Sequence, residues 1–411
     1  MPEKIETIII GGGQAGLGMS YHLSRLGREH LILERNRVAE RWRSERWDSL
    51  VLQFPNWMTR LPGHAYDGGD PNGFMHRDEV VRFIEDYANR IAAPLRCDVS
   101  VTRLRQHTGK TRFIVDTDNG PLEAVNVVAA TGPYQIAALP SCASGVSQDQ
   151  YQITANRYSN PDRLPDGAVL VVGSGASGYQ IAEDLLIKGR RVFLSVGRHR
   201  RVPRRYRGRD YGWWHEASGI ADRTVEALPP RFLPPLLTGV DGGKDADLRA
   251  LEKDGVTLLG SLREVDGDRL HFQSDVEANL AEGDQGIVDF RRQMDTFIEK
   301  QGIEAPDDPF VPPIARKEVS PLPDLDIRAA GITSLIWATG YRPDFRWIDC
   351  PVLDDAGRPI HRRGITQVPG LYFLGLQRLY KLKSSIIWGS GEDASYLAQH
   401  ITGQPEARSH P

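Results

Sequence analysis

The sequence has little cysteine, little net charge and no long apolar run, and each shortage excludes a class of protein. Three cysteines in 411 residues cannot form a disulfide framework, which indicates a reducing, cytoplasmic setting. Because 51 Lys+Arg nearly balance 54 Asp+Glu, the chain lacks the basic excess of a nucleic-acid-binding protein. No apolar run reaches the roughly 20 residues of a membrane-spanning helix. Residues 5–10 already read as a strand, so we expect no signal peptide.

Glycine, by contrast, is abundant, with 41 residues, and its first cluster lies near the N-terminus. The cluster follows the apolar run 8–10, precedes a helix-like stretch at 17–26, and reads Gly11-Gly12-Gly13-Gln14-Ala15-Gly16. A second strand-like run at 30–33 then ends in Glu34. This order of strand, Gly-x-Gly-x-x-Gly, helix, strand and acidic residue is typical of dinucleotide binding. The alternative is a glycine-rich turn in an unrelated α/β fold.

Each glycine of this motif has its own task. Gly11 permits a tight turn, Gly13 lets the backbone approach a pyrophosphate, and Gly16 lets the helix pack closely on the strand. The helix N-terminus would face the phosphates, and Glu34 would accept hydrogen bonds from ribose hydroxyls. An acidic ribose residue in an N-terminal unit favours FAD as the ligand.

A second cluster repeats the pattern in the middle of the chain. The apolar run 168–172 leads into Gly173-Ser174-Gly175-Ala176-Ser177-Gly178 and a further helix-like stretch. The next strand ends in Ser195, which we place where the first unit carries Glu34, and Arg198 follows it. A carboxylate would repel the 2′-phosphate of NADP, whereas Ser and Arg can bind it. This unit therefore favours NADPH over NADH; the alternative is that the basic tract is a solvated loop.

The order of the elements predicts an α/β fold with two Rossmann-like dinucleotide-binding domains, the NADP domain inserted into the FAD domain. We assign residues 1–160 and 325–411 to a discontinuous FAD domain. Residues 161–324 form the NADP domain with a loop-rich, partly helical insertion. A helix is predicted over 77–92, whereas helical patterns at 276–301 are broken by Gly283 and Gly286.

The pair of glycine motifs resembles class B flavoprotein monooxygenases, most of all the short bacterial flavin-containing type. Two Ala-Thr-Gly elements, at 130–132 and 338–340, and the strand-like stretch 371–375 belong to the same resemblance. In that family the linker before the second motif carries Phe-x-Gly-x-x-x-His-x-x-x-Tyr/Phe. The sequence departs from it here, with Thr154 about where the His belongs, and this leaves the subclass open.

The motifs and the resemblance together assign a set of site residues. Gln53 and Asn56 are candidate catalytic residues near the flavin, because neutral amides suit hydrogen bonding to flavin N5 or a bound peroxide. The other predicted cofactor-binding residues are Gln14, Ala15, Arg35, Trp42, Val99, Thr131, Gly132, Ala176, Ser177, Arg205, Thr339, Gly340, Gly375, Leu376 and Ser384. The aromatic side chains around residues 42–57 have an alternative role as ordinary core, and the tract around Arg205 as a solvated loop.

The resemblance implies an oxidoreductase that binds FAD and NADP. NADPH would reduce FAD, and a C4a-(hydro)peroxyflavin would pass one oxygen atom of O2 to a small organic substrate at nitrogen, sulfur, an aromatic ring or a carbonyl. No catalytic triad, metal cluster or paired carboxylates stand out, so positioning and water exclusion carry the chemistry. A homodimer is one option for the assembly. Two alternatives stay open: an NAD(P)H-dependent flavin reductase that serves a partner without a redox disulfide, and a non-catalytic flavoprotein sensor.

Overall fold

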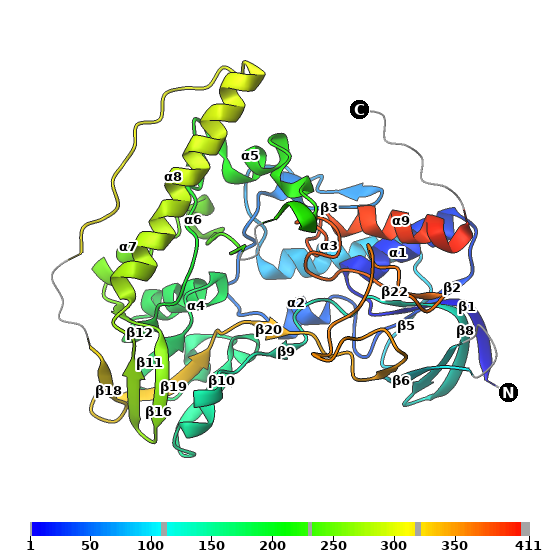
Figure 1. Ribbon diagram of the computed structural model, residues 1–411, viewed down its shortest axis with the longest axis horizontal. Helices are drawn as coiled ribbons and strands as arrows, with labels where there is room; N and C mark the ends of the chain where they lie inside the picture. Colours follow the sequence, from blue (N-terminus) through cyan, green and yellow to red (C-terminus); the bar gives the residue numbers. More distant parts are fainter. Residues whose placement is uncertain (1, 108–112, 229–231, 317–321, 404–411) are drawn as a thin grey trace.

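The protein is built around two β-sheets that lie side by side, each with its own helices (Figure 1). The structure, a computed structural model, describes residues 2–107, 113–228, 232–316 and 322–403. Within these ranges, no helix is long and apolar enough to cross a membrane. The chain begins in the first sheet, builds the second, and returns to the first with its last strands and helix.

The first sheet has the strand order β21-β6-β7-β8-β1-β2-β5, with β22 also paired to β8. Strand β1 runs parallel to both β2 and β8, and its last four residues are buried, as expected for an apolar run covered on both faces. The strands are β1 (Glu3–Ile10), β2 (His30–Leu33), β5 (Leu95–Arg96), β6 (Val101–Gln106), β7 (Phe113–Thr117), β8 (Gly120–Ala129), β21 (Ile348–Asp349) and β22 (Leu371–Phe373).

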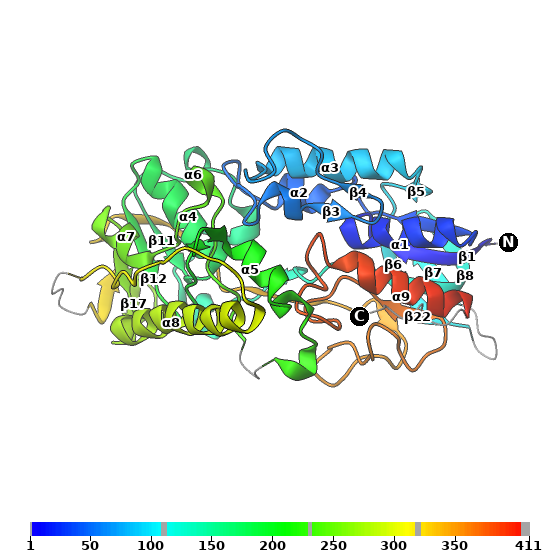
Figure 2. The same cartoon turned by 90° about the horizontal axis from the view of Figure 1, so that it is seen from above.

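Three longer helices belong to this first unit (Figure 2): α1 (Gln14–Arg25), α3 (Arg77–Arg90) and α9 (Ser390–Thr402). Helix α9, near the C-terminal end, packs on α1, near the N-terminal end. The predicted helix over 77–92 is confirmed by α3, whose apolar residues at helical spacing are buried. A capping box of His76 and Glu79 fixes its start.

The second sheet is parallel throughout, with the order β10-β19-β11-β12-β15. Alternate residues of β11 enter opposite cores, with Val169 and Val171 on one face and Leu170 and Val172 on the other. Helix α4 (Ala176–Ile187) covers the first face. The strands are β10 (Tyr151–Thr154), β11 (Ala168–Val172), β12 (Val192–Ser195), β15 (Thr257–Leu259) and β19 (Ile332–Trp337).

The strand pairing differs from the predicted assignment of strands to domains. We assigned 151–154 and 332–337 to the first unit, whereas both pair in the second sheet as β10 and β19. Short isolated strands of this kind give no signal of which sheet they join, because pairing is a long-range contact. The boundaries of the two domains remain a proposal, and residues 404–411 lie outside the described residues.

The remaining elements lie in loops or form the insertion. Helix α8 (Val276–Gln301) is continuous, so the predicted breaks at Gly283 and Gly286 are wrong. Each glycine instead allows a close approach: a Cβ at Gly283 would lie 2.4 Å from the His199 ring, and one at Gly286 2.5 Å from the Arg201 carbonyl oxygen. The others are α2 (Glu40–Ser44), α5 (Tyr211–Ala217), α6 (Val240–Gly243), α7 (Leu248–Lys253), β3 (Arg60–Leu61), β4 (His64–Ala65), β9 (Ile136–Ala137), β13 (Arg205–Tyr206), β14 (Arg209–Asp210), β16 (Leu262–Asp266), β17 (Arg269–Phe272), β18 (Asp324–Asp326) and β20 (Tyr341–Arg342).

Candidate functional site

The two glycine-rich turns have the same backbone geometry. Gly11 and Gly173 both have positive φ, +115° and +103°, and a Cβ on either would lie 2.6 Å from a carbonyl oxygen of the Ala-Thr-Gly element beside it. A Cβ at Gly16 would lie 2.0 Å from the Gly11 carbonyl oxygen, and one at Gly178 would lie 1.8 Å from that of Gly173. These four positions therefore require glycine for close packing of turn, helix and strand.

The middle glycines of the two motifs face open space. A Cβ at Gly13 or Gly175 would meet no atom within 4 Å. Both residues are helix N-caps without a side-chain hydrogen bond, and neither α1 nor α4 has an acidic residue in its first turn. Backbone N–H groups at each helix start thus lack a side-chain cap and face room for an anion, which fits a pyrophosphate.

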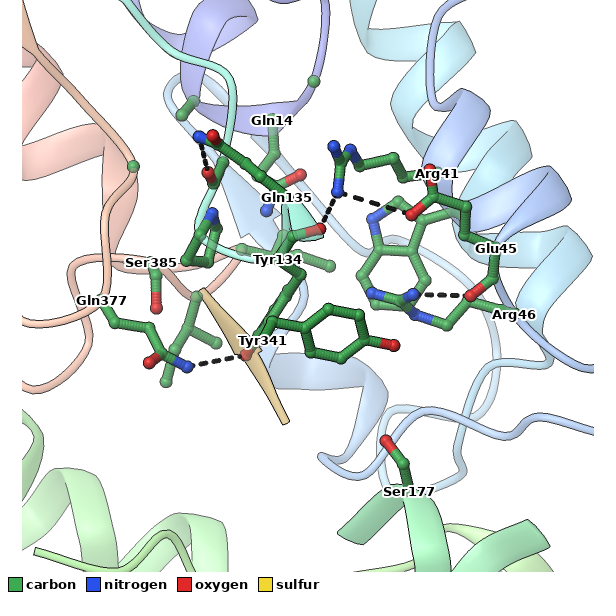
Figure 3. Close-up of a pocket in the computed structure, with 18 of the residues that line it drawn as sticks. Gln14, Arg41, Glu45, Arg46, Tyr134, Gln135, Ser177, Tyr341, Gln377 and Ser385 are labelled. Carbon is green, nitrogen blue, oxygen red and sulfur yellow. Dashed lines mark hydrogen bonds and ion pairs between the residues drawn. The ribbon is translucent and has the colours of Figure 1, made fainter. Parts of the chain in front are cut away.

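Both turns open into a single cavity of about 980 Å³ between the two sheets. Figure 3 shows Gln14 of α1 and Ser177 of α4 on opposite sides, with the Tyr341 ring in the space between them in this view. The predicted residues that line this cavity are Gly11, Gly13, Gln14, Ala15, Glu34, Arg35, Trp42, Gln53, Val99, Thr131, Gly132, Gly175, Ala176, Ser177, Arg198, Gly340 and Gly375.

Nine predicted residues lie outside the lining of the cavity as the described residues define it: Gly16, Asn56, Gly173, Gly178, Ser195, Arg205, Thr339, Leu376 and Ser384. Three of them are the packing glycines described above, which shape the turns without facing the cavity. Thr339 donates its hydroxyl to the Ala138 carbonyl oxygen at 2.6 Å, and Leu376 is buried in the core of the first unit.

Glu34 joins the end of β2 to the first glycine turn. One carboxylate oxygen accepts from the Gly12 N–H at 2.7 Å, and the other accepts from the Asn36 N–H at 3.1 Å. The side chain also lines the cavity. Because each carboxylate oxygen has a second lone pair, Glu34 can still accept hydrogen bonds from ribose hydroxyls.

Ser195 does not occupy the position of Glu34. The Gly11 N–H donates to the Leu33 carbonyl oxygen and the Gly173 N–H to that of Ser195, so Ser195 corresponds to Leu33 and the buried Val196 corresponds to Glu34. The Ser195 hydroxyl donates to the Gly260 carbonyl oxygen at 2.9 Å and accepts from the Leu262 N–H at 3.1 Å. The Ser195 side chain therefore holds the end of β12 to the segment 260–262 rather than facing a ligand.

The basic residues after β12 differ in their roles. Arg198 lines the cavity and is paired with Glu282 of α8. Arg205 donates to the carbonyl oxygens of Gly243 and Gly242, at 3.0 and 2.9 Å, and does not reach the cavity. The prediction of Arg205 as a cofactor contact missed these backbone partners, which a sequence does not reveal.

The two candidate catalytic amides also separate. Gln53 lines the cavity, whereas Asn56 is buried and donates its side-chain amide to the Asp70 carbonyl oxygen at 2.9 Å. Ser384 is likewise occupied, because its hydroxyl accepts from the N–H groups of Tyr380 and Lys381 within a turn. Its neighbour Ser385 lines the cavity instead.

A group of basic and aromatic side chains that was not predicted from the sequence lines the cavity between the two turns. The Arg46 guanidinium lies over the Trp42 ring, at 5.5 Å from its centroid, and over the Tyr134 ring, at 5.8 Å. Tyr134 in turn meets Tyr341 edge-on, with centroids 5.4 Å apart, and Arg41 donates to the Tyr134 carbonyl oxygen (Figure 3). Tyr134 and Tyr341 closely follow the two Ala-Thr-Gly elements, which was the available signal.

Two further pairs of aromatic side chains line the cavity. Phe54 and Trp388 meet edge-on with ring centroids 4.6 Å apart, and Tyr211 and His215, one turn apart on α5, lie 5.4 Å apart. Burial lowers the pKa of His215 to about 4 and raises that of Tyr211 to about 12, so both side chains are neutral near pH 7. His215 Nδ1 and Trp388 Nε1 have no hydrogen-bond partner among the described residues.

The three cysteines are solitary thiols that do not line this cavity as the described residues define it. Cys97, Cys142 and Cys350 are free, and no cysteine is among the described residues that line the cavity. Burial raises the pKa of each thiol, which disfavours the reactive thiolate. The geometry offers no dithiol in reach of the two turns.

Comparison with known proteins agrees with this architecture. A family model described as pyridine nucleotide-disulphide oxidoreductase matches residues 8–208. A Geobacillus kaustophilus protein named "Uncharacterized oxidoreductase CzcO-like" is 33% identical over 98% of this chain and 99% of its own. An Arabidopsis thaliana protein named "Probable indole-3-pyruvate monooxygenase YUCCA1" is 30% identical over 44% of both chains.

Solved structures match along nearly the whole chain. The flavin-containing monooxygenase from Stenotrophomonas maltophilia is 18% identical, with a TM-score of 0.68 over 98% of this chain and 99% of its own. The structure of OTEMO in complex with FAD and NADP is 14% identical, with a TM-score of 0.60 over 98% and 86%. These two likenesses concern the fold. The full-length relative shows that the chain belongs to the CzcO-like oxidoreductases.

Proposed function

We propose that this protein is an FAD-dependent monooxygenase that draws electrons from NADPH and transfers one oxygen atom of O2 to a small organic substrate. One observation carries the proposal: two helix N-termini, each behind a glycine turn with open space, face the same cavity of about 980 Å³. Two dinucleotides held there would share one space, as hydride transfer between them requires.

The first unit suits FAD. The N-terminus of α1 would hold the pyrophosphate, and Glu34 would accept hydrogen bonds from the ribose. The second unit suits the nicotinamide dinucleotide, with α4 at its pyrophosphate. When bound, FAD supplies hydride acceptance and oxygen activation, which no side chain can provide.

The chain's own residues would position the substrate and keep water out. The aromatic compartment of Phe54, Trp388, Tyr211 and His215 lines the cavity without a charged group among these four. Burial of apolar surface there favours substrates with a ring or a branched apolar body.

The decisive test follows oxygen and product together. Purified protein is reconstituted with FAD and supplied with NADPH and O2, and a panel of amines, sulfides, indoles and ketones is added singly. Indole-3-pyruvate belongs in the panel because a relative is named for it. The proposal expects NADPH oxidation that rises with one class of substrate and a product that carries one oxygen atom from O2. An amine, sulfide, indole or ketone then becomes heavier by one oxygen atom, whereas a 2-oxo acid gains that atom and releases CO2.

Two other outcomes point to the alternatives. Equal NADPH oxidation with and without substrate, together with rapid anaerobic reduction of a dye, would indicate a flavin reductase that serves a partner. Bound flavin that neither NADPH nor NADH reduces would indicate a non-catalytic sensor. Either result contradicts the monooxygenase proposal.

A further inference from the structure

Helix α8 passes unusually close to the loop that follows β12. The two glycines described above, Gly283 and Gly286, let the helix backbone come within contact of His199 and Arg201. Their neighbour Glu282 is thereby held beside Arg198, 84 residues earlier in the chain. This contact places a carboxylate at the rim of the second dinucleotide site.

The Arg198 side chain engages Glu282 through one edge of its guanidinium, the edge formed by Nε and Nη2. Its Nε donates to the two carboxylate oxygens at 3.0 and 2.8 Å, and its Nη2 donates to Oε1. The hydrogen bond to Glu282 raises the pKa of Arg198. A carboxylate and a phosphate present similar pairs of oxygens to the two N–H donors of this guanidinium edge. The Glu282 carboxylate therefore occupies a place that a phosphate could take.

The neighbouring arginines offer no substitute. Arg201 is buried and paired with Asp247 and Asp284, and the Arg200 guanidinium lies 5.8 Å from the Phe232 ring centroid. Of these three arginines, only Arg198 lines the cavity. The hydroxyl of Ser195, as shown above, is also engaged.

We propose that Glu282 is a specificity-determining residue that competes with the 2′-phosphate of NADP for Arg198. The inference rests on the proposed function, because it requires the second unit to bind a nicotinamide dinucleotide. NADH can bind while the Arg198–Glu282 pair stays closed. The 2′-phosphate of NADPH must open the pair to use this edge of Arg198, and it must tolerate the carboxylate beside it in either case. The native preference for NADPH is therefore modest, and Glu282→Gln increases it.

The size of the effect follows from charge. The 2′-phosphate carries about −1.5 to −2, and a unit charge about 5 Å away in water changes binding severalfold for each charge it faces. Replacing Glu282 by Gln removes this repulsion and frees the Arg198 fork. We expect about tenfold tighter binding of a 2′-phosphate ligand at low salt, with less gain at high salt because screening weakens the repulsion.

The experiment measures binding of two nucleotide fragments to the FAD-loaded protein by calorimetry: 2′,5′-ADP, which carries the 2′-phosphate, and AMP, which lacks it. Glu282→Gln should tighten 2′,5′-ADP about tenfold and leave AMP unchanged. Asp289→Asn is the matched control, because Asp289 is an exposed carboxylate two helical turns further along α8. It should change neither affinity. Steady-state kcat/KM for NADPH relative to NADH should rise in parallel in the Gln variant.

The outcomes separate the inference from the function on which it rests. If both fragments bind the native protein but Glu282→Gln leaves their affinity ratio unchanged, the competition is refuted and the dinucleotide site stands. If Asp289→Asn shifts the ratio as much as Glu282→Gln, the effect is one of general charge, and the inference is also refuted. If neither fragment binds the native protein, the assignment of the second unit fails, and the inference fails with it.

Discussion

Two alanine substitutions in the first glycine turn should affect different properties: Gly13→Ala should weaken FAD binding, and Gly16→Ala should lower stability. At Gly13 an added Cβ meets no atom within 4 Å, and φ of −85° is accessible to alanine. Alanine is a poorer N-cap than glycine by roughly 0.5–1 kcal/mol, and the smaller entropy of the unfolded chain offsets about as much. Gly13→Ala should therefore leave the free energy of unfolding of the FAD-free protein within about 0.5 kcal/mol.

The same methyl group should weaken FAD binding strongly. In the proposed site it occupies the space through which a pyrophosphate approaches the N-terminus of α1. Loss of one charge-assisted hydrogen bond, worth about 1.5–3 kcal/mol, lowers affinity roughly ten- to a hundredfold. Titration of the FAD-free protein with FAD, followed by flavin fluorescence, measures this directly.

Gly16→Ala is the contrasting variant. Its Cβ would lie 2.0 Å from the Gly11 carbonyl oxygen, so α1 must move by about 1 Å to relieve the overlap. Overpacking of this kind costs about 1–3 kcal/mol, and a backbone partner cannot rotate away as a side chain can. The FAD-free variant should melt several degrees lower. Native FAD affinity in Gly13→Ala, or native thermal stability in Gly16→Ala, would refute the assignment of these two roles.

Three further predictions follow from the contacts of single residues. Ser195→Ala should lower the free energy of unfolding by about 1–3 kcal/mol, measured in urea, because it leaves the Leu262 N–H without its acceptor; a changed preference for NADPH with native stability would contradict this. Asn56→Asp should likewise lower the free energy of unfolding, since a carboxylate cannot donate to the Asp70 carbonyl oxygen. The loss should be equally large in urea unfolding of the protein without FAD, because it does not depend on a flavin contact. His215 has a pKa lowered to about 4 against about 6.5 when unfolded, so the unfolded state binds more protons and stability should fall by about 3 kcal/mol as the pH drops from 6.5 to 4. His215→Gln should flatten that part of the stability profile relative to the native protein, and an unchanged profile would show that His215 is not buried as a neutral ring.

The glycine motifs were predictable because their constraints are local. Gly11 and Gly173 need positive φ, and Gly16 and Gly178 need the absence of a Cβ, and both demands appear in six consecutive residues. The apolar runs before them predicted buried strands for the same reason. The fold class followed from the order of these elements along the chain.

The contacts between distant segments were not predictable in this way. Ser195 was matched with Glu34, whereas it corresponds to Leu33, one residue earlier in the first unit. A sequence does not show which carbonyl oxygen accepts the hydrogen bond from the first glycine of the turn. Asn56 and Ser384 have the right residue type for a flavin contact, but backbone groups already engage the side-chain NH2 of Asn56 and the hydroxyl of Ser384. Gly283 and Gly286 resemble helix breaks in sequence and are contact points in space.

The comparison of the two turns suggests why one unit would retain its dinucleotide and the other would exchange it. In the first, the residue after the second strand is a carboxylate that holds the turn through the Gly12 N–H and faces the cavity. In the second, the Ser174 hydroxyl ties the turn to Gly197, and the equivalent strand position is the buried Val196. In the proposed function, recognition of the ribose would therefore pass from a partly buried acid to Arg198, which is 45% exposed. Exposed ion pairs contribute little binding energy and open readily. This difference favours FAD as a cofactor that stays in the first site and the nicotinamide dinucleotide as a reductant that leaves the second.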